Sequence, residues 1–334
     1  MRTLATPAPV NFVYLTPFDV DAARTSEDID AFVSGDVKNR FLFSGQRADL
    51  NMIAMTYFYL RAAGIDNVIL SPEPQDGAIN IMHSEHIRRA PPTSSQFTVC
   101  VQGDYPRRPQ AQFHIVQNRD QLRDDDAVVW LWPQPGLLPR AASREDRFRR
   151  IGYLGQVEGN LAHDVACWQE KLRSLDLEFV APPPDRWHDY RDIDAVVGVR
   201  RFARNPFPNK PPSKLVNAWF AGVPFIGGTD SAFRQVGHDG EDYLEVRSED
   251  GLMAALKLLR DRRDIRERIV NRGRESSVAF TKPALIERWC EVLQGPVTER
   301  YQRWRDNPRA ETLRYSTRSA MHRGMELAKR AIRR

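Results

Sequence analysis

The chain has 334 residues, a mass of 38.4 kDa and 41% hydrophobic residues, which favours two globular domains over one and excludes bulk disorder. Its longest apolar run is Ala127–Trp132, whereas a membrane-spanning helix needs about 20 residues, so the sequence excludes an integral membrane protein. The first nine residues lack the features of a signal peptide, and three widely spaced cysteines argue against a disulfide framework. We therefore expect a cytoplasmic protein.

Positive charge is concentrated at the C-terminal end. The whole chain carries +5, but residues 295–334 contain eleven Lys or Arg and four Asp or Glu, so this tail carries +7 and the rest −2. A basic tail suits an anionic partner, which could be a membrane surface, a nucleic acid or an acidic face of the same protein.

The first half alternates short apolar runs with one clear helical pattern. Apolar residues recur at helical spacing from Asn51 to Ala62, and Gly64 follows where a C-cap would lie. Short apolar runs ended by polar residues, Gly or Pro are typical of buried parallel strands. We predict strands at residues 10–15, 41–44, 68–70, 78–82, 97–101, 113–116 and 127–132.

A Pro-rich and charged stretch at residues 133–147 is the best candidate linker, and the same rhythm then begins again. We predict strands at 151–154, 179–180, 195–199, 223–226 and 243–246, and helices at 161–175 (capped by Asn160), 214–221, 252–259 and 282–293. The pattern predicts an α/β protein with two doubly wound domains, residues 1–140 and 148–294, followed by a helical tail at 295–334.

One segment carries a family resemblance. Ala218-Trp-Phe-Ala-Gly-Val-Pro-Phe-Ile226 is a helix end, a Gly turn and a strand, followed by Gly227-Gly228 and later by Asp239-Gly240. It resembles the donor-binding segment of GT-B glycosyltransferases, especially retaining enzymes of the group 1 type that use nucleotide sugars. Weaker likenesses are Ile151–Gly155, Trp132–Gly136 and the strand ending in His83.

The resemblance implies two Rossmann-like domains that face a cleft. The N-terminal domain would hold the acceptor, the C-terminal domain would bind the nucleotide sugar, and the tail would pack back on the N-terminal domain. It implies hexosyl transfer to a glycan or lipid-linked acceptor in surface polysaccharide synthesis. No metal and no cofactor beyond the nucleotide-diphosphate sugar are expected. Two glutamates common in the family fall on Asn209 and Asn217, which cannot supply negative charge.

Cations near this segment suit a diphosphate. Breaking the bond to the anomeric carbon builds negative charge on the leaving phosphate, which cations and backbone N–H groups at a helix N-terminus can stabilise. Functional and solvated surface roles are both open for each Arg and Lys. The predicted donor-binding residues are Gly155, Arg200, Arg201, Lys210, Ser213, Lys214, Asn217, Gly227 and Gly228.

Two residues of the first half are candidates for catalysis. His83 ends a predicted strand and could contact sugar or acceptor, or be a structural histidine. His86 lies nearby, but the pair has no third ligand, so a metal site is not expected. Asp104 also follows a strand and could act as an acceptor-side base, although Gly-Asp before Tyr-Pro is ordinary turn chemistry.

The tail has a stripe of mainly small residues at helical spacing, with Arg314, Arg318, Arg323 and Arg330 outside it. The stripe consists of Leu313, Thr317, Ala320, Met321, Gly324, Ala328 and Ala331. Packing on the first domain and peripheral attachment to anionic lipid at the inner membrane face are both open.

The leading function is a glycosyltransferase; the alternatives are a nucleotide-sugar epimerase and a non-catalytic GT-B-like module that binds nucleotide or glycan. Nucleic-acid binding is not expected, because no recognisable motif accompanies the basic charge.

Overall fold

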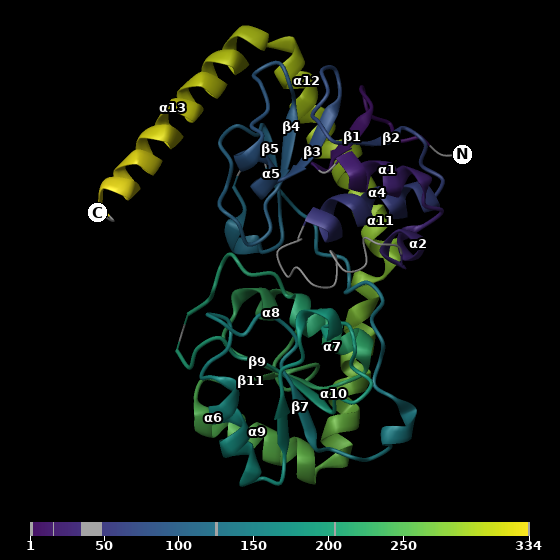
Figure 1. Cartoon of the computed structure of the whole chain (residues 1–334), viewed down its shortest axis with the longest axis vertical. Coiled ribbons are helices and arrows are strands. Elements are labelled where there is room, and N and C mark those ends of the chain that lie inside the picture. The colour runs from purple at the N-terminus through teal and green to yellow at the C-terminus, as the bar shows by residue number, and fades with distance from the viewer. Residues whose placement is uncertain (1–2, 16, 35–48, 124–125, 204, 333–334) are drawn as a thin grey trace.

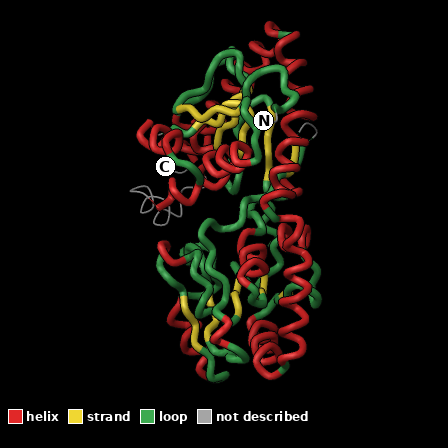
Figure 2. Tube along the Cα trace, turned by 90° about the vertical axis from the view of Figure 1, so that its right-hand side faces the viewer, coloured by secondary structure: helices red, strands yellow, loops and turns green. Residues whose placement is uncertain are grey.

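The computed structural model describes residues 3–15, 17–34, 49–123, 126–203 and 205–332, so the strand predicted at 41–44 lies outside the described residues. Two α/β domains lie end to end, and a long helix projects from the first (Figure 1). In each domain, helices lie on both sides of the strands (Figure 2). This confirms the predicted class of two doubly wound domains with a helical tail.

The first domain contains a six-stranded parallel sheet in the order β2-β1-β3-β4-β5-β6. Strand β1, second from one edge, pairs with both β2 and β3, and Val10 lies opposite Val68 and Ile79. All four residues of β1 are buried, and three of them are apolar; the fourth, Asn11, donates to Asn80 Oδ1 at 2.9 Å. The run predicted at 127–132 forms a strand only at its first two residues. The strands are β1 (Val10–Val13), β2 (Val68–Ser71), β3 (Ile79–His83), β4 (Thr98–Val101), β5 (Phe113–Val116) and β6 (Ala127–Val128).

One helix of this domain was predicted from the sequence, and the structure contains further helices. The predicted helix at residues 51–62 is a π-helical turn, η1 (Leu50–Ala54), that continues into α4 (Met55–Ala62). The remaining helices are α1 (Pro17–Thr25), α2 (Ile29–Ser34), α5 (Ser84–Arg89) and the short η2 (Arg119–Gln121).

The second domain has a five-stranded parallel sheet in the order β11-β10-β9-β7-β8. Its strands are β7 (Arg150–Gly152), β8 (Glu178–Val180), β9 (Ala195–Gly198), β10 (Phe225–Gly227) and β11 (Leu244–Glu245). Its helices are α6 (Val165–Arg173), α7 (Ser213–Ala221), α8 (Ser231–Val236), α9 (Glu249–Asp261) and α10 (Arg263–Ser276); short turns are η3 (Ala142–Arg144), η4 (Pro184–Arg186) and η5 (Ser277–Phe280).

Two helix ends in this domain show how the local sequence sets the boundaries. Asn160 does not cap α6; Asp164 does, because its Oδ1 accepts a hydrogen bond from the backbone N–H of Cys167 at 2.7 Å. Gly222 ends α7 in the left-handed conformation with φ 69°, which a glycine adopts without strain.

The chain crosses between the domains twice. The first crossing is the Pro-rich linker, and the second is α11 (Lys282–Val292), which continues through η6 (Leu293–Val297) into α12 (Thr298–Asp306). Although the sequence assigns residues up to 294 to the second domain, α11 already packs in the core of the first. Its Trp289 ring lies 6.2 Å from that of Phe12 on β1.

The last helix, α13 (Pro308–Ile332), leaves the first domain and extends away from it (Figure 1). Its contact with the domain is made by residues such as Tyr315, whose hydroxyl donates to the Pro92 carbonyl at 2.6 Å. The stripe expected to pack inward does not do so over its described part, because Leu313 and Met321 are exposed. Among the described residues, no helix combines the length and apolar character needed to cross a membrane.

Candidate nucleotide-sugar site

A cavity of about 640 Å³ lies between the two domains. Residues at the carboxyl ends of strands from both sheets reach it, as expected for open parallel sheets. Glu85, Arg89, Asp104, Tyr105, Pro106 and Gln134 come from the first domain and the linker, and Leu154, Gly155, Gln156, Asn160, Trp187, Arg200, Lys210, Pro211, Ser213, Lys214 and Asn217 from the second.

Lys214 lies on the first turn of α7, at the end where backbone N–H groups are free. Its ammonium lies 4.9 Å from the centre of the Tyr153 ring. A Cβ at residue 155 would come within 2.9 Å of Lys214 Nζ, so glycine at this position makes room for the lysine. Burial, reinforced by Arg200, lowers the pKa of Lys214 to about 7. An anion in the cavity would therefore meet a poorly solvated cation.

Arg200 enters the cavity from the loop after β9. Its Nε donates to the Asp230 carboxylate at 2.8 Å, and its Nη1 donates to the side-chain oxygen of Asn160. Burial raises the pKa of Asp230, although the neighbouring Arg200 opposes this shift. The asparagine expected to begin a helix instead positions this arginine.

Lys210 connects the two domains. Its Nζ donates to Asp104 Oδ2 at 2.7 Å, and its backbone carbonyl accepts from the Asn118 side chain at 3.0 Å. Asn118 also contacts Ser231 Oγ and Gln235 of α8. The facing edges of the domains are thus joined by polar groups, with Asp104 and Lys210 nearest the cavity.

His83 does not line the cavity, but it lies behind Tyr105, which does. Its ring packs edge-on against the Tyr105 ring at 4.9 Å, and Tyr105 lines the cavity. The Nδ1 atom accepts from the Glu85 N–H at 3.3 Å, which assigns the proton to Nε2. That buried Nε2 has no hydrogen-bond partner among the described residues. Burial lowers the pKa of His83 to about 4, so the ring is neutral.

The other predicted site residues divide into two groups. Ser213 and Asn217 line the cavity, but Asn217 Oδ1 already accepts from the Gln134 N–H at 3.0 Å and so ties α7 to the linker. Arg201, Gly227 and Gly228 do not line it. A Cβ at Gly227 would collide with Phe225 and Phe233, so this glycine serves core packing.

Sequence reasoning missed several lining residues: Glu85, Arg89, Tyr105, Gln134, Gln156, Asn160 and Trp187. Glu85 and Arg89 follow directly after the strand ending in His83, and that position was the available signal. Trp187 follows η4 in a Pro-rich loop and has no local pattern that marks it. His86 pairs with Asp49 at 2.9 Å, and no group of three His, Cys, Asp or Glu able to hold a metal occurs within the described part of the chain.

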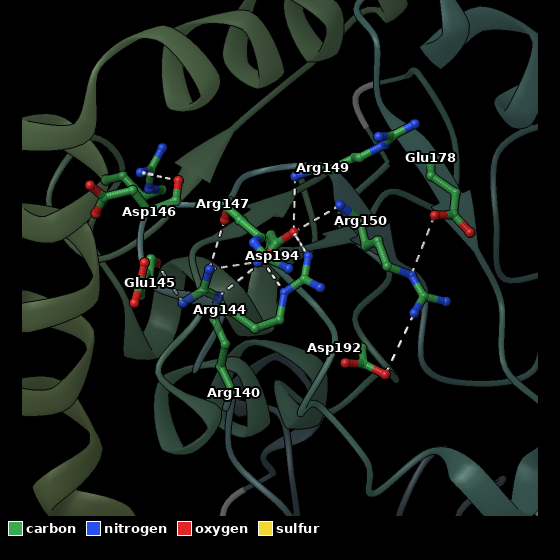
Figure 3. A network of polar contacts seen from close by, with 11 residues as sticks. Arg140, Arg144, Glu145, Asp146, Arg147, Arg149, Arg150, Glu178, Asp192 and Asp194 are labelled. Carbon is green, nitrogen blue, oxygen red and sulfur yellow. Dashed lines mark hydrogen bonds and ion pairs between the residues drawn. The ribbon is translucent and has the colours of Figure 1, made fainter. Parts of the chain in front are cut away.

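A second cavity, of about 690 Å³, lies elsewhere on the C-terminal domain, beside the buried carboxylate of Asp194. This carboxylate accepts from the guanidinium groups of Arg140 and Arg144 and from the backbone N–H groups of Arg149 and Arg150 (Figure 3). Burial opposes ionisation, but these bonds outweigh it, and the pKa of Asp194 lies below its usual range. The arrangement fastens the linker to the second domain and leaves no excess of positive charge for a ligand.

No family model matches the sequence, and no curated protein is significantly similar to it. Solved structures do match. HepE of Anabaena, in complex with UDP, has 11% identity and a TM-score of 0.50; the match covers 88% of this chain and 99% of HepE. The chain has the GT-B fold. The expected resemblance to GT-B glycosyltransferases is thus confirmed for the architecture.

Other GT-B-like matches are partial. TarM of S. aureus, in complex with fondaparinux, α-GlcNAc-glycerol and UDP, has 8% identity and a TM-score of 0.47, with 72% of this chain and 59% of TarM covered. The pneumococcal O-GlcNAc transferase GtfA, in complex with UDP and GlcNAc, has 12% identity and a TM-score of 0.42, with 73% and 60% covered. The chain therefore spans the length of HepE but about three fifths of these larger proteins.

Proposed function

We propose that this protein is a glycosyltransferase that moves a sugar from a nucleotide-diphosphate sugar to a glycan or lipid-linked acceptor, as in surface polysaccharide synthesis. One observation carries the proposal: Arg200, Lys210 and Lys214 converge, beside the N-terminus of α7, on a cavity between two GT-B domains. Cations and free backbone N–H groups together form a site for a diphosphate.

In the proposed reaction, the bond between the anomeric carbon and the β-phosphate oxygen breaks while an acceptor oxygen bonds to that carbon. The acceptor hydroxyl loses its proton, and the nucleoside diphosphate leaves with additional negative charge. Lys214 and Arg200 lie on the donor side and would stabilise that charge most strongly, because both are poorly solvated. Lys210 would join them once it leaves Asp104.

Residues of the first domain would handle the acceptor. Asp104 would be released from Lys210 when the diphosphate binds and could then accept the acceptor proton. The proton on His83 Nε2 is free for a sugar hydroxyl, provided that Tyr105 shifts from its place over the ring. On the opposite wall, Trp187 would provide a face on which a nucleobase can stack.

Calorimetry with UDP, GDP, ADP and dTDP tests the donor site, with UDP placed first because HepE was solved with it. Binding of at least one nucleotide, followed by hydrolysis of the matching nucleotide sugar, is expected. Failure of all four to bind would contradict the proposal.

A non-catalytic role as a nucleotide-binding or glycan-binding module is the second candidate. The observation that favours it is the occupied Asn217 oxygen at a position where the family commonly has glutamate. Nucleotide binding without hydrolysis or transfer would support this role. Conversion of the nucleotide sugar to an epimer, without an acceptor, would instead identify an epimerase. For the transferase we propose a cytoplasmic location.

A further inference from the structure

A third cavity lies where α12 and α13 meet, away from the cavity between the domains. Its volume is about 560 Å³, and four arginines and one glutamate are among its lining residues. The lining residues are Arg300, Arg303, Asn307, Ala310, Glu311, Arg314 and Arg318.

Positive charge exceeds negative charge in this corner. The buried Glu311 carboxylate accepts from Arg300 at 2.8 Å and from Arg314 at 2.6 Å. The Arg300 and Glu311 side chains are only 7% and 3% exposed, so this pair is a fixed part of the wall. Arg314 is largely exposed, and Arg318 forms no ion pair within the described part of the chain. Four guanidinium groups and one carboxylate line the cavity, and guanidinium groups suit phosphate oxygens.

Apolar side chains accompany these arginines on α13. Leu313 and Met321 are 69% and 65% exposed, the two most exposed large hydrophobic residues of the described chain. They are eight residues apart, a little over two helical turns, so both lie on one side of the helix. Arg314 and Arg318 lie beside that side. Tyr315 holds the opposite side against the first domain through Pro92.

We propose that the arginine-lined cavity and the exposed side of α13 that carries Leu313 and Met321 dock the protein on an anionic phospholipid membrane. The arginine cavity would take a headgroup phosphate, while Leu313 and Met321 would enter the interface between headgroups and acyl chains. Charge complementarity supports this occupant, because residues 295–334 carry +7 while the rest of the chain carries −2. A free phosphate would account for the arginines but not for the two exposed apolar side chains. The proposal does not rest on the glycosyltransferase activity, since none of these residues lines the donor cavity.

Flotation of the full-length protein with two kinds of vesicle tests this inference. We expect binding to vesicles that contain phosphatidylglycerol and little binding to pure phosphatidylcholine. The double variant Arg314→Ala/Arg318→Ala should bind on the order of tenfold more weakly. Its matched control is Arg262→Ala/Arg272→Ala, which removes the same charge from exposed arginines of the second domain. Leu313→Ser/Met321→Ser should also lose binding, whereas Val278→Ser, another exposed apolar position, should not.

Three results would overturn the inference. The first is no binding of the unchanged protein to phosphatidylglycerol vesicles, and the second is an equal loss in the arginine variant and its control. The third is calorimetric binding of inorganic phosphate that depends on Arg314 and Arg318 without any vesicle binding, which would assign the cavity to a soluble anion. Circular dichroism verifies that each variant is folded.

Discussion

Lys210 Nζ lies 2.7 Å from Asp104 Oδ2, so a cation of the second domain is neutralised by a carboxylate of the first. The pair lies at the edge of the cavity where the diphosphate is proposed to bind. A diphosphate would compete with Asp104 for this lysine, and binding would then release the carboxylate.

Replacing Asp104 should therefore tighten binding of a nucleoside diphosphate. In Asp104→Asn, Lys210 no longer has a charged partner, and we expect affinity to rise severalfold while transfer to an acceptor falls. Calorimetry measures the first effect and a product assay the second. Asp120→Asn, at another polar contact between the domains, is the control and should leave affinity unchanged. Weaker binding in Asp104→Asn would show that the pair assists the donor site.

Removing Lys214 should weaken nucleotide binding. We expect Lys214→Ala to lower affinity at least tenfold, because a poorly solvated cation next to a phosphate contributes more than an exposed one. Lys257→Ala, on the exposed side of α9, should change affinity less than twofold. Calorimetry on both variants gives the comparison, and equal effects would remove Lys214 from the site.

The same lysine should make binding depend on pH. Its pKa is lowered to about 7, so the free protein carries the ammonium below pH 7 and loses it as the pH rises. Affinity for a nucleoside diphosphate should therefore fall between pH 6 and pH 8.5, and this fall should be absent in Lys214→Ala. An unchanged slope in the variant would assign the dependence to another cationic group of the protein.

Replacing His83 should affect turnover and leave donor affinity unchanged. The His83 pKa of about 4 means a neutral ring throughout an assay from pH 5 to 8. We expect His83→Gln to lower kcat at least tenfold without altering the shape of the pH–rate profile. His238→Gln, at an exposed position, is the control. If the pH–rate profile of His83→Gln lost its acidic or alkaline limb, the histidine would titrate during the reaction.

The Asp194 network should matter for stability. Asp194→Asn leaves two largely buried arginines with a neutral partner, and we expect a loss of about 3–5 kcal/mol in the free energy of unfolding. Because the folded pKa is depressed, the carboxylate contributes fully above about pH 4, and its contribution is lost as the pH falls through the folded pKa. Urea unfolding at pH 7 checks the magnitude. Asp192→Asn, at an exposed pair with Arg150, should cost at most about 1 kcal/mol.

Much of the architecture could be predicted because parallel strands are buried on both faces and appear as short apolar runs. The segment from Lys214 to Ile226 was the most informative, since the helix, the left-handed Gly222 and the following strand each have a local signal. Local signals were less reliable where a side chain has a distant partner. Asn160 resembles a helix cap but bonds to Arg200, forty residues away.

The candidate site was predicted only in part, for the same reason. Lys210, Lys214 and Arg200 could be selected because cations beside a helix start suggest an anion site. Their partners Asp104 and Asp230 depend on how the loops fold back, and no spacing in the sequence indicates this. Gly227 and Gly228 were predicted to bind the donor, yet the Phe225 and Phe233 rings occupy the space beside Gly227.

The chain segment that leads into the linker lies next to the segment that forms the second connection. Arg288 of α11 donates to the Val128 carbonyl at 3.0 Å, and the Trp130 and Phe280 rings are 6.1 Å apart. Two adjacent tethers restrain twisting and sliding more than they restrain bending about the line that joins them. Opening of the cavity to admit the proposed nucleotide sugar would then follow a single hinge motion. Cleavage of either connection would leave the two domains joined through the other.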